Sequence, residues 1–303
     1  MENVNKKYLG AGLVCFAASL WGLDGIVLTP RLFKLGVPFV VFILHFVPFV
    51  FMSFLFGKRE MKNIAALPKK DLFYYFCIAL FGGSLGTLSI VKALFLVNFQ
   101  HLTVVTLLQK CQPIFALILA RLILKEKLGK NFCFLTLLAM IGGYVMTFEF
   151  ALPRSTGSDN ILPACGLALL AAFSFGSSTV FGKRILTNSS FITALYTRFF
   201  FTSIVTFVFV LLSGDFRYFS QVTPYQWLIF VTIMLTSGSM AIMIYYRGLR
   251  YIDASVATIC ELAFPISSVV FDYIFNGNLL TPQQFMGAVL LVFAIISIGK
   301  NQR

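Results

Sequence analysis

The residues best placed to bind a ligand are two charged side chains that lie deep within long apolar stretches. Lys110 and Glu261 are each followed within four residues by a proline, Pro113 and Pro265. Proline removes a helix hydrogen bond, so it can bend the chain and free a backbone carbonyl beside the charge. In a membrane each such charge costs roughly 2.5 to 3.5 kcal/mol, and side chains of this kind usually face a cavity. Lys110 and Glu261 therefore either bind a polar ligand or form an ion pair that holds two helices together.

Three further residues offer chemistry suited to a polar ligand. Arg198 presents planar donors that match a carboxylate or a phosphate. A histidine side chain ordinarily titrates near neutral pH, so His45 is a candidate to carry a proton, although a lone membrane histidine is as often a packing residue. Asp24 can bind an amine, carry a proton or counter the charge of Lys92. Glu261, His45 and Asp24 are the candidates for proton coupling.

Aromatic side chains with a polar edge are also candidates to line a cavity, because their N–H or O–H group needs a partner. They are Trp21, Tyr144, Tyr196, Tyr245 and Tyr246. With two of these and the glutamine beside the deep lysine, the predicted substrate-binding set comprises Lys110, Glu261, Arg198, His45, Gln109, Trp21 and Tyr245.

Three other basic residues, Lys92, Arg121 and Arg247, lie close to the ends of their apolar stretches. Long side chains in such positions extend their charge to the interface between lipid and water. We therefore expect Arg121 to be dispensable for ligand binding, whereas Lys110 lies too deep to reach water except through a cavity.

Ten apolar stretches carry these residues, and most have about the length that a helix needs to cross a bilayer. The sequence is 59% hydrophobic and only 12% charged, which leaves little room for a soluble domain. The stretches lack the period-two alternation of membrane barrel strands. They predict an all-α membrane protein with spans at Leu9–Leu28, Val37–Phe56, Leu72–Phe95, Leu102–Leu124, Phe132–Phe148, Leu162–Leu186, Phe191–Leu212, Trp227–Leu249, Ala254–Phe275 and Pro282–Gly299.

The basic residues between the spans predict the orientation of the chain. The net charge is +13, but the basic residues are spread over the connections instead of forming one nucleic-acid-binding face. Fifteen of them fall on the side of the termini, and only Arg31, Lys34, Arg154 and Arg217 fall on the other. The positive-inside rule then places both termini in the cytoplasm of a multi-pass protein of the inner membrane.

The second half of the sequence repeats features of the first at an offset near 150 residues. Examples are Trp21-Gly22 with Phe175-Gly176, and the glutamine or glutamate four residues before the two prolines. We expect one transmembrane domain made of two five-helix repeats, residues 1–150 and 151–303. Because five is odd, the second repeat enters the membrane from the opposite side, which gives inverted repeats as in many transporters.

These features resemble the drug/metabolite transporter superfamily, in particular its ten-helix bacterial permeases. The resemblance rests on the repeats, Trp21-Gly22, the basic-Phe pairs at His45 and Arg198, and the segment Lys125–Leu128 after the fourth span. It implies ten transmembrane helices and secondary transport, with no particular substrate. The sequence departs from the pattern at His45, where arginine is usual, and at Gly277–Leu280, which lacks an acidic residue like Glu126.

We expect a permease that moves a small polar metabolite by alternating access, most simply an amino acid, because the deep charges have both signs. An anionic metabolite is the next candidate, and a small organic cation held in an aromatic cage the third. A different class, a non-transporting scaffold or lipid-handling protein, would call for large loops or catalytic clusters. The sequence shows no enzyme, metal or cofactor motif. The expected partners are the substrate, the lipid bilayer and a proton. We expect the protein to be a monomer or a homodimer.

Overall fold

The computed structural model describes residues 2–97, 105, 108–150, 161–277, 279 and 281–300, and these form helices without any strand. The α-helices are α1 (Glu2–Leu23), α2 (Val37–Ala65), α3 (Lys69–Ile78), α4 (Gly86–Leu96), α6 (Gln112–Leu119), α7 (Lys130–Phe148), α8 (Ile161–Ile185), α9 (Phe191–Ser213), α10 (Pro224–Leu235), α11 (Ser239–Leu249), α12 (Ala254–Cys260), α13 (Ala263–Asn276) and α14 (Pro282–Lys300). Short π- or 3₁₀-helical segments are η1 (Asp24–Leu28), η2 (Thr29–Leu32), η3 (Ala79–Leu85), η4 (Ala120–Leu124) and η5 (Asp215–Ser220).

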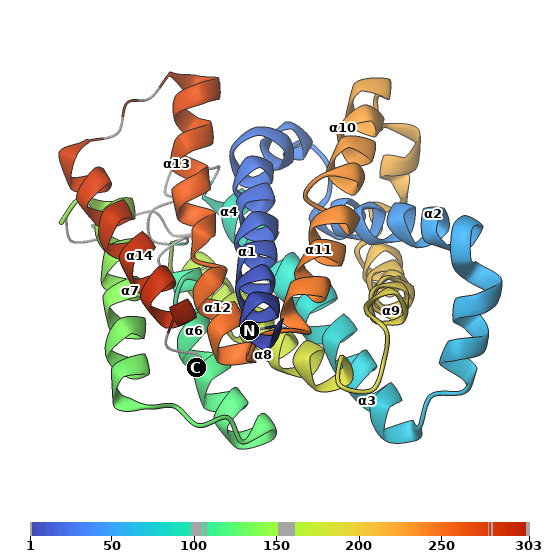
Figure 1. Ribbon diagram of the computed structural model, residues 1–303. Helices are drawn as coiled ribbons and strands as arrows, with labels where there is room; N and C mark the ends of the chain where they lie inside the picture. Colours follow the sequence, from blue (N-terminus) through green and yellow to red (C-terminus); the bar gives the residue numbers. More distant parts are fainter. Residues whose placement is uncertain are drawn as a thin grey trace.

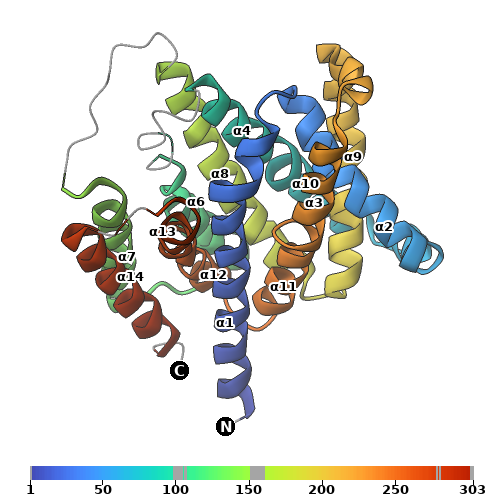
Figure 2. The ribbon, with the colours of Figure 1, turned by 90° about the horizontal axis from the view of Figure 1, so that it is seen from above.

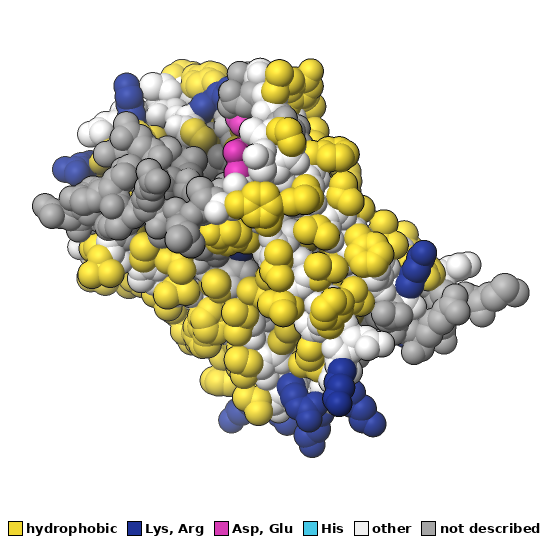
Figure 3. All heavy atoms as spheres, turned by 90° about the vertical axis from the view of Figure 1, so that its left-hand side faces the viewer, with side chains coloured by type: hydrophobic (Ala, Val, Ile, Leu, Met, Phe, Trp, Pro, Cys, Tyr) yellow, Lys and Arg dark blue, Asp and Glu magenta, His cyan; other side chains and the backbone are white. Residues whose placement is uncertain are grey.

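The lengths and surfaces of these helices are those of a multi-pass membrane protein. Among the described residues, seven helical stretches are long and apolar enough to span a bilayer, and three shorter apolar helices cover residues 112–124, 130–146 and 282–298. Large hydrophobic side chains are exposed on α7 and α14, for example Phe134 at 66% and Phe285 at 64%. Figure 3 shows hydrophobic side chains across the middle of this face and a group of Lys and Arg side chains at its lower end. Such a surface requires lipid.

Helices from the two halves of the chain pack in pairs. The most extensive contacts join α2 to α9, α7 to α14, α1 to α11 and α13, and α8 to α4 and α6 (Figures 1 and 2). The pattern is the same in the two halves: α1 contacts α11 and α13 of the second half, as α8 contacts α4 and α6 of the first. The described residues thus form one interlocked bundle in which every large interface, apart from those between chain neighbours, joins the two halves.

Gly176 lets α8 and α6 approach at backbone distance. A Cβ atom at this position would lie 3.0 Å from the backbone nitrogen of Ala116 and 3.0 Å from the carbonyl oxygen of Gln112. Neither atom can move aside as a flexible side chain could. The glycine therefore fixes the distance between α8 and the start of α6, where the deep polar residues lie.

The same contact occurs between α1 and α13. A Cβ atom on Gly22 would lie 3.0 Å from the backbone nitrogen of Ser268 and 3.1 Å from the carbonyl oxygen of Phe264. Phe264 and Ser268 lie 152 positions after Gln112 and Ala116, the two residues that face Gly176. The glycine pair that the sequence comparison aligned thus makes equivalent backbone contacts in the two halves.

Two membrane helices are interrupted beside their deep charged residue. A turn at Lys110 and Cys111 precedes α6, and a turn at Glu261 and Leu262 separates α12 from α13. In both turns the chain shifts to i to i−3 bonding: the N–H of Cys111 donates to Leu108 (3.1 Å), and that of Leu262 to Ile259 (3.0 Å). Local departures of this kind are typical of functional sites in helices, and here they direct polar groups into the bundle.

We expect Gly176→Leu to destabilise the protein by about 1 to 3 kcal/mol, because an added side chain must push α6 away. Thermal unfolding in detergent measures this effect. The matched control is Gly166→Leu on the same helix, where an added Cβ meets nothing within 4 Å. A melting temperature for Gly176→Leu equal to that of Gly166→Leu would contradict the assigned contact.

Candidate functional site

A cavity of about 510 Å³ lies between the two halves of the bundle. The first residue of the chain that lines it is Trp21, near the end of α1, and Thr29, beyond the end of η1, also lines it. No described residue of α1 before Trp21 belongs to the lining. It therefore extends from mid-depth toward the end of the bundle opposite the start of α1. The lining includes every residue of the predicted substrate-binding and proton-coupling sets: Trp21, Asp24, His45, Gln109, Lys110, Arg198, Tyr245 and Glu261. Their proposed roles remain predictions.

Glu261 accepts three side-chain hydrogen bonds in the cavity wall. Its Oε1 accepts hydrogen bonds from the hydroxyl of Tyr245 (2.7 Å) and from Thr179 Oγ1 (3.1 Å). Its Oε2 accepts a short hydrogen bond from the side-chain amide of Gln112. These donors come from α11, α8 and α6, so one carboxylate at the break between α12 and α13 joins three other helices. A carboxylate in an apolar setting needs such partners.

Arg198 lies on α9 and faces the same cavity. Its side chain is largely buried, and its Nη1 donates to Tyr246 Oη (3.2 Å) and Ser178 Oγ (3.5 Å). Its Nε is buried and has no hydrogen-bond partner among the described residues. The guanidinium group thus keeps donor capacity that the protein does not use. His45 lies nearby on α2 with Nδ1 2.8 Å from the carbonyl oxygen of Val41, so its hydrogen bond to the protein is local.

The cavity changes character along its length. Near Glu261 its wall is aromatic: the rings of Trp21 and Tyr245 lie 5.5 Å apart. Toward the other end, Asp24 accepts a hydrogen bond from Thr29 Oγ1 (2.8 Å) and faces the cavity from η1. Among the described residues no ion pair joins this carboxylate to Lys92. The site therefore combines an aromatic region beside Glu261 with a polar pair at Asp24 and Thr29.

The sequence separated deep charges from peripheral ones but missed several polar partners. Lys92, Arg121 and Arg247 are exposed and absent from the described cavity lining, as expected for side chains at helix ends. Tyr144, Tyr196 and Tyr246 are also absent from that lining. The partners that sequence reasoning missed are Ser178 and Thr179 on α8. Hydroxyl residues are frequent in membrane helices, so the two carried no distinguishing signal.

At the opposite end of the bundle, Glu126 links the two halves. Its carboxylate accepts hydrogen bonds from the backbone N–H groups of Ala254 (2.8 Å) and Ser255 (3.0 Å), the first two residues of α12. Nearby, Nζ of Lys183 on α8 donates to the carbonyl oxygens of Leu249 (3.1 Å) and Arg250 (3.3 Å) at the end of α11. A carboxylate at a helix N-terminus satisfies otherwise unpaired donors and complements the helix dipole. The capped helix leads directly to Glu261.

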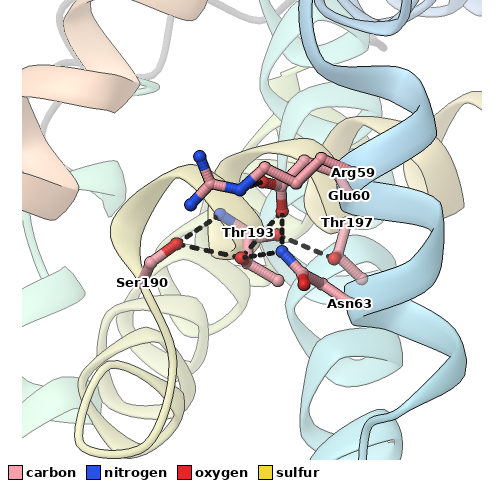
Figure 4. Close-up of polar contacts among 6 residues, drawn as sticks. All are labelled: Arg59, Glu60, Asn63, Ser190, Thr193 and Thr197. Carbon is pink, nitrogen blue, oxygen red and sulfur yellow. Dashed lines mark hydrogen bonds and ion pairs between the residues drawn. The ribbon is translucent and has the colours of Figure 1, made fainter.

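A second polar cluster fastens α2 to the start of α9 (Figure 4). The fully buried Glu60 accepts hydrogen bonds through Oε2 from Thr193 Oγ1 (2.8 Å) and Asn63 Nδ2 (3.0 Å), and Oε1 lies 3.6 Å from Nε of Arg59. Ser190 caps α9 through the backbone N–H of Thr193 (3.1 Å). None of these residues lines the cavity, so the cluster is a packing element. The sequence did not single out Glu60, because it lies among charged residues that read as a solvated connection.

We expect Glu126→Ala to destabilise the protein by about 1 kcal/mol, since two N–H groups of α12 lose their acceptor. Thermal unfolding in detergent measures the loss. Lys127→Ala, an exposed neighbour in the same connection, is the control. Equal melting temperatures for the two variants would show that the cap contributes nothing to stability.

A cavity between two packed halves, lined by polar groups from interrupted membrane helices, defines a membrane transport protein. The profile of the EamA-like transporter family matches residues 8–148 and, a second time, residues 162–299. The chain belongs to this family, which confirms the resemblance to drug/metabolite transporters. It is accordingly a transporter and not an enzyme.

The riboflavin transporter ImpX of Fusobacterium nucleatum is 65% identical over 291 residues, which cover 96% of this chain and 97% of that protein. An uncharacterized transporter of Synechocystis is 23% identical over 80% of this chain and 70% of its own length. A crystal structure of a protein with 16% identity superposes with a TM-score of 0.73 over 97% of this chain and 99% of that one, which shows a shared fold.

The expectation of an amino-acid substrate finds no support in these relatives. It was drawn from the ionisable side chains alone, and their pairing could not be seen in the sequence. In the structure, Glu261 already accepts three hydrogen bonds from the protein. Apolar residues such as Ile90, Val91 and Phe199 also contribute to the lining. The charges therefore do not by themselves call for a zwitterion.

Proposed function

We propose that the protein is a secondary transporter of riboflavin that works by alternating access. The observation that carries the proposal is the 65% identity, over nearly the full length of both chains, to a protein named as a riboflavin transporter. The cavity supports it, because about 510 Å³ falls within the range of roughly 300 to 1,000 Å³ usual for sites that bury a drug-sized ligand. A wall that is mostly apolar with a few convergent polar groups also suits an uncharged aromatic ligand that carries hydroxyl groups.

We further propose that the transporter has ten transmembrane helices in two inverted repeats, residues 1–150 and 151–303. The matching interhelical contacts and the equivalent backbone contacts of Gly22 and Gly176 support this arrangement. The two separate matches to the family profile support the duplication. The charge bias supports an inner-membrane protein with both termini in the cytoplasm. The first ten residues of the second repeat, 151–160, lie outside the described residues.

Counterflow in proteoliposomes tests the substrate. Vesicles loaded with unlabelled riboflavin should take up labelled riboflavin, and binding should raise the melting temperature of the purified protein. Vesicles loaded with a mixture of amino acids are the control and should not exchange. Exchange of amino acids without exchange of riboflavin would overturn the proposal.

We expect Lys110→Ala to abolish riboflavin exchange and Arg121→Ala to leave it near the level of the wild type. Lys110 lines the cavity, whereas Arg121 is exposed at the end of its helix. Counterflow on equal amounts of folded protein measures both variants. Equal activities would return Lys110 to a structural role.

A further inference from the structure

We propose that riboflavin binds with the pyrimidine end of its isoalloxazine ring against Arg198 and Glu261, and with its ribityl chain toward Asp24 and Thr29. This inference rests on the proposed riboflavin transport and adds the orientation of the ligand and the residues that select it. The pyrimidine end carries an imide, in which one N–H donor (N3) lies between two carbonyl acceptors (C2 and C4). A site that reads this edge must present donors and an acceptor side by side.

Arg198 supplies the donors. Its Nη1 is held by Ser178 and Tyr246, whereas its Nη2 has no hydrogen-bond partner among the described residues and is not enclosed as Nε is. Because Arg198 lines the cavity, this open donor can bond a ligand carbonyl there. The planar guanidinium group also restricts the direction of its N–H bonds, so it favours an acceptor that lies in its plane.

Glu261 supplies the acceptor. A carboxylate has about four positions for hydrogen-bond donors. Three are taken by Gln112, Thr179 and Tyr245. One acceptor position therefore remains for the ligand, and the part-exposed side chain is accessible from the cavity.

The two groups are placed together by neighbouring residues. Ser178 and Thr179 are consecutive on α8, and Tyr245 and Tyr246 are consecutive on α11. In each pair, one residue holds the guanidinium group and the other holds the carboxylate. Among the described residues no ion pair joins the two charged groups, so neither neutralises the other directly. The floor thus presents fixed donors and one acceptor, which complements a neutral imide.

The surroundings distinguish this orientation from its reverse. The rings of Trp21 and Tyr245 lie beside the carboxylate, where a flat aromatic ligand gains stacking contacts. A flexible chain of hydroxyl groups would leave those faces poorly covered. Beyond Trp21 along the chain, η1 and η2 contribute Asp24 and Thr29 to the lining. Their oxygen atoms suit the ribityl hydroxyls.

Competition against labelled riboflavin tests the orientation with two analogues. Lumiflavin replaces the ribityl chain by a methyl group, and N3-methylriboflavin blocks the imide N–H. We expect lumiflavin to bind within roughly 10-fold of riboflavin. We expect N3-methylriboflavin to bind at least about 10-fold more weakly, because it leaves a buried acceptor unpaired and adds bulk at the floor.

Variants test whether Glu261 and Arg198 cause the weaker binding of N3-methylriboflavin. In Glu261→Gln and Arg198→Lys the ratio of the N3-methylriboflavin and riboflavin dissociation constants should fall at least about threefold. Asp24→Asn is the matched control, because it alters a carboxylate at the other end of the same cavity, and its ratio should stay at the wild-type value. Only variants that elute as single species on size exclusion are compared.

The outcomes separate the two proposals. Failure of the wild-type protein to bind riboflavin would overturn the proposed function. If riboflavin binds but N3-methylriboflavin binds as tightly, or if lumiflavin fails to compete, the orientation is wrong and riboflavin transport stands. The analogue comparison needs no variant, so a variant that fails to fold does not weaken the test.

Discussion

The structure depends on how a carboxylate is kept inside an apolar bundle. An unpaired ionised group in hydrocarbon is costly, so Glu261 must be satisfied by donors from the protein. Its partners Gln112, Thr179 and Tyr245 lie on α6, α8 and α11, while Glu261 itself interrupts the path from α12 to α13. One residue thereby fixes the positions of helices from both halves at the floor of the cavity. Because both oxygens are already engaged, the site is preorganised and offers a ligand a single acceptor.

Close helix packing is what allows such a polar floor to exist. In lipid the hydrophobic effect gives helices little reason to associate, so small residues and interhelical hydrogen bonds must hold them together. Gly22 and Gly176 bring α13 and α6 to backbone distance from their partners. These two helices follow the interruptions at Glu261 and Lys110. The glycines therefore act on the geometry of the site, although neither needs to contact the ligand.

The sequence predicted the location of the cavity better than its chemistry. The insertion cost of a charge identified Lys110, Arg198 and Glu261 without any structure, because few mechanisms other than a cavity tolerate a charge at that depth. The all-helical fold followed from the lengths of the apolar stretches. The substrate did not follow, because the amino-acid prediction rested on the signs of the deep charges and not on the hydrogen bonds that these groups make within the protein.

The hydrogen bonds that change this interpretation come from Ser178 and Thr179 and join residues between 20 and 82 positions apart. No periodicity in a single sequence predicts such pairings. The same limit applies to Glu60, whose burial depends on the packing of α2 against α9.

The two ends of the bundle differ in how they are fastened. At the end away from the cavity, Glu126 caps α12 across the boundary between the halves, and Lys183 bonds the last carbonyl groups around α11. The corresponding segment of the second half, Gly277–Leu280, contains no acidic residue, so it has no carboxylate with which to make the equivalent cap. A charge-assisted bond to a helix terminus must break before that end can open. Charge-assisted bonds between the halves therefore hold the capped end, and the cavity extends toward the opposite end.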